Sequence, residues 1–139
     1  MLLDWSVGEL AAGLKCYRGQ EFFDAHEHWE NVWRQSHGPE KSFLQALIQV
    51  AGALHHYRRK NQRGSAALLR AALRRLEPYP ERFGGVLLAP LRQELTDWLN
   101  ALEANGEAIL EPVPLLYPEI RLDPASAEPT SAEPGQPAR

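Results

Sequence analysis

The stretch Phe43-Leu-Gln-Ala-Leu-Ile-Gln-Val-Ala-Gly-Ala-Leu-His-His-Tyr57 decides the fold. On a helix with about 100° between successive residues, its apolar side chains cover most of the circumference. A helix of this kind is buried on nearly all sides. We therefore expect the helix at about 41–60 to be the central element, with other helices packed around it.

Local signals predict further helices at about 7–18, 20–35, 65–77 and 90–103. Ser6 and Glu9 have the spacing of a capping box, and Gly19 suits a helix end. Pro78 and Pro80 end the fourth of the five helices, and Pro90 suits the first turn of the last. No alternating strand pattern of useful length is present. The predicted fold is all-α, a compact array of four to five helices.

The composition of the chain changes after about residue 105. Seven of the eleven prolines lie between Pro112 and Pro137. We expect one helical domain at 1–104, an extended segment at 105–123 that packs on the helices, and a Pro-rich tail at 124–139. The tail has too little apolar surface to fold, so it is predicted to be disordered.

Overall composition excludes several classes of protein. A net charge of −3 argues against coating of nucleic acid through bulk charge. Cys16 is the single cysteine, which excludes a disulfide framework and a Cys-rich zinc site. The N-terminus lacks a basic flank with an apolar run, and no stretch approaches the ~18 apolar residues of a membrane span. A soluble, cytoplasmic protein is expected.

The segment Phe22-Phe-Asp-Ala-His-Glu-His-Trp-Glu-Asn-Val-Trp33 carries the strongest functional signal. In a helix, His26 and Glu30 fall among apolar positions that should enter the core. An unpaired charge there costs several kcal/mol, so both side chains need partners. His28 and Asp24 project to the opposite arc and are expected to be solvated.

The central helix offers a polar stripe of Gln45, Gln49, Gly52 and His56. If the two helices pack antiparallel, the stripe can face His26 and Glu30. His26, Glu30 and His56 would then offer three ligands to a divalent metal, with Glu27 or a glutamine as a fourth contact. Imidazole and carboxylate groups suit zinc, manganese or iron rather than calcium.

Two other interpretations of these residues stay open. The same side chains can form a closed hydrogen-bonded network that fixes the helix pair, or they can line a pocket for a small polar ligand without a metal. His-Glu-x-x-Glu is not the His-Glu-x-x-His of zinc proteases. In an enzyme, Glu27 or Glu30 would be the general base and a bound metal would activate water. No catalytic triad, phosphate loop or redox pair is present, so no particular reaction is predicted.

A basic surface provides an alternative function. Eight of the fifteen basic residues lie between Arg58 and Arg82. Arg59, Arg63, Arg70 and Arg74 repeat close to helical spacing and could face phosphates. Few aromatic residues lie nearby for base stacking, so a solvated basic face is favoured over contact with nucleic acid. The sequence predicts neither another partner nor an oligomeric state.

Three blocks, at 22–33, at 43–51 with His56, and at Asn61-x-x-Gly64, resemble domain of unknown function family 309. The resemblance covers about 16–79 and implies a small all-helical fold without an established activity. Seven positions match the polar motif of the family: His26, Glu27, Glu30, Gln45, Gln49, His56 and Asn61. The resemblance thus implies that Glu27, Gln45, Gln49 and Asn61 contribute to ligand binding. Asp24 stands where glutamate is commoner, and Lys60 where a glycine often precedes the asparagine.

Overall fold

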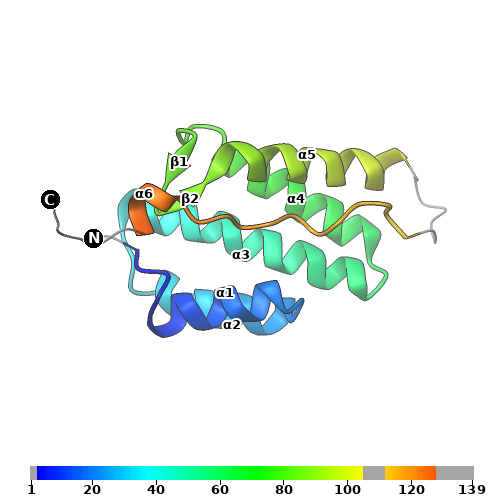
Figure 1. Cartoon of the computed structure of the whole chain (residues 1–139). Coiled ribbons are helices and arrows are strands. Elements are labelled where there is room, and N and C mark those ends of the chain that lie inside the picture. Colours follow the sequence, from blue (N-terminus) through cyan, green and yellow to red (C-terminus); the bar gives the residue numbers. More distant parts are fainter. Residues whose placement is uncertain (1–2, 105–111, 128–139) are drawn as a thin grey trace, which may run out of the picture.

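A computed structural model places helix α3 (Gly38–Arg58) in the middle of the molecule (Figure 1). It describes residues 3–104 and 112–127. Helices α1 (Gly8–Arg18) and α2 (Phe22–Trp33) lie on one side of α3, and α4 (Gln62–Leu76) and α5 (Leu88–Ala104) lie on the other. The all-α prediction is confirmed. The α3 side chains without solvent contact are Phe43, Leu44, Ala46, Leu47, Val50, Ala51, Ala53 and Leu54.

Three short elements complete the described structure. Strands β1 (Arg82–Phe83) and β2 (Val86–Leu87) pair antiparallel, and α6 (Pro124–Ala127) lies at the end of the described chain. Gly84 and Gly85 both have positive φ, which the tight turn between the strands requires. The hairpin is absent from the sequence prediction because two-residue strands are too short to show alternation.

The turns between α1 and α2 and between α3 and α4 have the same geometry, 40 residues apart. Gln20 and Lys60 both have φ of 64°. The residue after each has nearly the same dihedrals, φ −97° and ψ 75° at Glu21, φ −99° and ψ 78° at Asn61. Each of these two N–H groups donates over 2.8 Å to a carbonyl five residues back, as in a Schellman motif. The chain therefore contains two matching helical hairpins, a repeat that we did not predict.

The start of α1 differs from the sequence prediction. Its N-cap residue is Val7, whose side chain caps nothing. Ser6 instead donates its hydroxyl to Asp4 over 2.6 Å, and Glu9 pairs with His28 of α2 over 2.6 Å. The predicted capping box is therefore wrong. His28, expected in solvent, joins α1 to α2.

After α5, residues 112–123 run extended along the molecule, between the α1–α2 hairpin and α5 (Figure 1). Their far end continues onto β2: Leu87 donates its N–H to Arg121 over 2.9 Å, and Asp123 donates to Gly85 over 2.8 Å. The first part of the predicted extended segment, 105–111, and most of the predicted tail, 128–139, lie outside the described residues. Among the helices that are described, none has both the length and the apolar character that a bilayer crossing requires.

Candidate functional site

His26 and Glu30 lie at the edge of the core rather than inside it. Their side chains are 28% and 33% exposed to solvent. His26 Nε2 lies 3.8 Å from a Glu30 oxygen. Arg34 approaches the other Glu30 oxygen at 3.4 Å. Both distances are long for charge-assisted hydrogen bonds. The desolvation cost of the His26–Glu30 pair is therefore smaller than that of a buried pair, because water still reaches it.

An aromatic cluster joins α2 to α3 beside this pair. The ring of Phe23 stacks on His26 at 6.0 Å and lies 5.3 Å from His55, whose ring is 6.2 Å from that of His56. Phe23 is nevertheless 50% exposed. Burial lowers the pKa of His55, and the nearby positive charges of Arg59 and the other imidazoles lower it further. The cluster thus presents an exposed ring and three imidazoles to solvent.

The polar stripe of α3, which we call the polar strip (Gln45, Gln49, Gly52 and His56), forms the outer face of that helix between α2 and α4. All four residues are half-buried. On the α4 side, Arg75 approaches Gln49 Oε1 at 3.4 Å and Ser42 Oγ at 3.2 Å. On the α2 side lies Trp33. The ammonium group of Lys41 is 4.5 Å from the centre of the Trp33 ring. The strip is therefore half-buried and contacts α4 through Gln49.

Gly52 lets α4 pack closely against the polar strip. A Cβ at this position would lie 3.1 Å from Leu68 Cδ1 of α4, closer than ordinary van der Waals contact. Leu68 therefore takes up the space that a side chain at Gly52 would need.

His56 and Asn61 form a small structural unit at the end of α3. Asn61 Oδ1 accepts the N–H of Gly64 at 2.9 Å, which caps α4, and Nδ2 donates to His56 Nδ1 at 3.1 Å. Because Nδ1 accepts, the ring proton of neutral His56 lies on Nε2, a tautomer assigned from these contacts. A Cβ on Gly64 would lie 2.6 Å from Asn61. The Asn61-x-x-Gly64 motif therefore builds a helix cap, and both ends of the Asn61 side chain are engaged.

The predicted metal ligands are not assembled into a ready site. Within residues 3–104 and 112–127, no three His, Cys, Asp or Glu side chains are grouped to hold a metal ion. Glu27 is exposed. Gln49 bonds to α4, and His56 to Asn61, so neither completes the pair on α2. Metal binding by His26, Glu30 and His56 stays a prediction without support from this arrangement.

The closed network is not formed either among the described residues. His26 Nδ1 is buried without a hydrogen-bond partner there, and the side chain of Gln45 makes no hydrogen bond within them. The contact of Gln49 with Arg75 of α4 explains part of the difference from the prediction. Apolar periodicity shows which side of a helix is buried, but not which neighbouring helix the remaining polar side faces.

Within the described residues, Arg70 of the predicted basic row pairs with Glu103 of α5. Two basic residues outside that row are also engaged: Arg82 lies 3.6 Å from Asp123, and Arg58 donates to the carbonyl of Gln20 at 3.0 Å. Phosphate binding by Arg59, Arg63, Arg70 and Arg74 stays a prediction. The described surface also has an open cleft lined by Asp4, Val7, Glu9, Leu10, Asn31, Val32, Arg34 and Gln35. None of the predicted site residues lines it.

Three contributors to the face were missed from the sequence. Phe23 lies beside the predicted pair, one turn before His26, and the apolar run at 22–23 was the available signal. His55 has a ring 5.3 Å from that of Phe23 and 6.2 Å from that of His56. Arg75 comes from α4, and no feature of the sequence connects it with Gln49.

Comparison with known proteins is consistent with the resemblance seen in the sequence. Residues 10–68 match a family model described as "Domain of unknown function (DUF309)", which confirms the resemblance over that range. An uncharacterized protein of Aquifex aeolicus (strain VF5) is 32% identical over 87 residues, 62% of this chain. The matched region spans only 26% of that relative.

Proposed function

We propose that the DUF309 region of this chain binds a small polar ligand with an anionic group on the face formed by α2, α3 and α4. One observation carries the proposal: the Gln45 amide of the half-buried polar strip and the buried His26 Nδ1 make no hydrogen bond within the described residues. Buried polar groups are normally paired. Polar groups that the protein leaves without a partner are typical of a place where a ligand supplies the partners.

Gln45 and His26 supply most of this unused capacity. The Gln45 amide can donate two hydrogen bonds and accept two, and none is made within the described residues. His26 Nδ1 is buried without a partner there.

Positive charge at both borders favours an anionic group. Arg75 stands on the α4 side and Lys41 on the α2 side. The contacts of Arg75 with Gln49 and Ser42, at 3.4 Å and 3.2 Å, are longer than those of a strong guanidinium pair. A carboxylate or phosphate can therefore replace them with little loss, and it gains a bidentate partner.

The proposal can be tested by following the side-chain amide signals of Gln45 and Gln49 in ¹⁵N-labelled protein during titration with inorganic phosphate and with succinate. We expect saturable shifts at these two residues with one of the probes. Arg75→Ala should weaken that binding at least 5-fold. Arg74→Ala is the matched control, because this neighbour on α4 is also exposed but does not make the contacts with Gln49 and Ser42 that Arg75 makes.

Zinc and manganese belong in the same titration, since His26, Glu30 and His56 were predicted as their ligands. A metal that shifts the imidazole signals of His26 and His56 together would support the metal interpretation instead. Shifts that are equal in wild type and Gln45→Ala, or spread over every basic residue, would contradict the proposal.

A further inference from the structure

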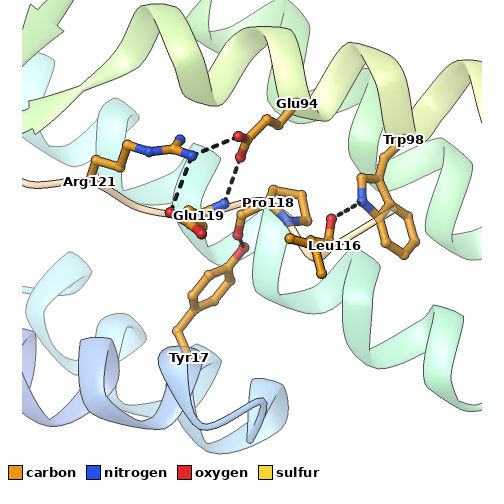
Figure 2. A network of polar contacts seen from close by, with 7 residues as sticks. All are labelled: Tyr17, Glu94, Trp98, Leu116, Pro118, Glu119 and Arg121. Carbon is orange, nitrogen blue, oxygen red and sulfur yellow. Dashed lines mark hydrogen bonds and ion pairs between the residues drawn. The ribbon is translucent and has the colours of Figure 1, made fainter. Parts of the chain in front are cut away.

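A different face of the molecule holds an extended stretch of chain through its main-chain atoms (Figure 2). Trp98 Nε1 donates to the carbonyl of Leu116 over 2.8 Å, and the hydroxyl of Tyr17 donates to that of Pro118 over 2.6 Å. Arg18 donates to the carbonyl of Ile120 over 3.0 Å. Helices α1 and α5 thus contact every second carbonyl of this stretch.

Two N–H groups of the same stretch are also satisfied by helix side chains. Val113 donates its N–H to the hydroxyl of Tyr57 over 2.8 Å, and Glu119 donates to a Glu94 oxygen over 2.8 Å. Five main-chain groups are therefore bound by side chains of α1, α3 and α5, in the way that proteins bind extended peptides without a fixed sequence. We call the surface formed by Tyr17, Arg18, Tyr57, Glu94 and Trp98 the main-chain groove.

Some side chains of the bound stretch add specificity. Val113, Pro118 and Ile120 are buried, and Arg121 donates to Glu94 over 2.9 Å. Leu116, by contrast, is 88% exposed. The groove therefore selects an apolar residue, a proline five positions later, an apolar residue two positions after that, and then a basic residue.

The repeated hairpins explain why the groove has this form. Tyr17 and Tyr57 occupy equivalent positions, 40 residues apart, three residues before the left-handed residue of each turn. The Tyr17 ring is buried, and its hydroxyl makes its hydrogen bond to the bound stretch. Since an unpaired buried hydroxyl is costly, the groove is built to hold an occupant.

We propose that the main-chain groove is a receptor for an extended segment of a partner protein, and that residues 112–123 are the competitor built into the chain. Charge complementarity favours this partner, because the Glu94 carboxylate can receive both an N–H and a basic side chain. An attached segment acts at an effective concentration on the order of mM. A partner segment therefore binds the intact chain weakly and binds strongly once residues 112–123 are displaced. This proposal is independent of the polar strip.

The test uses the full chain with its own segment disabled by Val113→Asp and Ile120→Asp, which leaves every groove residue in place. The probe is a fluorescein-labelled peptide with the wild-type sequence of residues 112–123, and its binding is followed by fluorescence anisotropy. We expect at least 10-fold tighter binding to the disabled chain than to wild type. Tyr17→Phe added to the disabled chain should weaken binding by about 5-fold, because one hydrogen bond is lost. A peptide that carries the same two aspartates should not bind.

Helix content and thermal unfolding establish that the disabled chain is folded. If it is not, Ile120→Ala alone is the milder variant, and the same order of affinities is expected. Equal affinity of the peptide for the wild-type and disabled chains, or no effect of Tyr17→Phe, would overturn the proposal. Wild-type chains that exchange residues 112–123 to form dimers, without a gain in peptide affinity, would assign the groove to a second copy and also overturn it.

Discussion

Gly13→Ala should destabilise the protein although alanine favours helices. A Cβ at Gly13 would lie 2.3 Å, 2.5 Å and 2.9 Å from three atoms of the Trp29 indole, where carbon contacts normally lie at about 3.5–4.0 Å. Trp29 has no solvent exposure, and its N–H donates to Leu10 over 3.3 Å. The ring therefore cannot swing away, and α1 and α2 must separate by roughly 1 Å.

The magnitude follows from two opposing effects. Alanine in place of glycine inside a helix gains about 0.5–1 kcal/mol, whereas overpacking of a core costs about 1–3 kcal/mol. With three contacts this short we expect the upper end of the cost, and a net loss of about 2 kcal/mol. In a domain of this size the Tm should fall by roughly 8 °C. Urea unfolding followed by circular dichroism measures the change in free energy.

Gly52→Ala is the matched control. Its Cβ would meet only the terminal methyl of Leu68, at 3.1 Å, and this half-buried side chain can rotate. The free energy of unfolding should stay equal or rise by up to ~1 kcal/mol. A rescue is available as well, because the second hairpin has Ala53 and Leu69 where the first has Gly13 and Trp29.

In a Trp29→Leu background, Gly13→Ala should therefore be nearly neutral, with a coupling of at least about 1 kcal/mol. Equal losses from Gly13→Ala in both backgrounds would refute the reasoning, as would a loss from Gly52→Ala of the same size as that from Gly13→Ala.

Three other predictions concern single residues. Lys60→Gly should raise the free energy of unfolding by about 0.5–1 kcal/mol, because φ of 64° is strained for lysine; Lys60→Ala should change it little, and urea titration of both variants checks this. Burial lowers the pKa of His55 below its ordinary value of 6.5, so the unfolded chain binds this proton more readily and stability should decline as the pH falls below about 6.5. His55→Gln should make that decline shallower between pH 7.5 and 5.5, and an unchanged slope would show that His55 is not its cause. Glu30→Gln should alter the free energy of unfolding by less than ~1 kcal/mol, since the ion pairs of Glu30 are long and partly solvated. A loss above ~2 kcal/mol would instead support the interpretation as a closed hydrogen-bonded network.

The central helix was predictable because its apolar residues surround it, and their number leaves few other arrangements. The C-terminal ends of α1 and α5, at Arg18 and Ala104, also agree closely with the sequence signals. The capping box failed for a physical reason. Glu9 has a stronger partner in His28, which lies on another helix, and local spacing contains no information about such a partner.

The geometry of the candidate site was not predictable from the sequence. Gln49 contacts Arg75 of α4, and the spacing of residues within α3 contains no information about that partner. The main-chain groove could not be predicted from the sequence. Every residue has a similar main chain, so the sequence does not show which carbonyl and N–H groups bind side chains. The hairpin repeat did leave a trace, since Leu14 and Tyr17 recur as Leu54 and Tyr57.

The matching turns give the molecule a modular character. Each hairpin contributes one tyrosine hydroxyl to the extended stretch at 112–123, Tyr17 to Pro118 and Tyr57 to Val113, and the turn lies between its two helices. The same 40-residue repeat therefore sets how far apart these two contacts lie along the stretch.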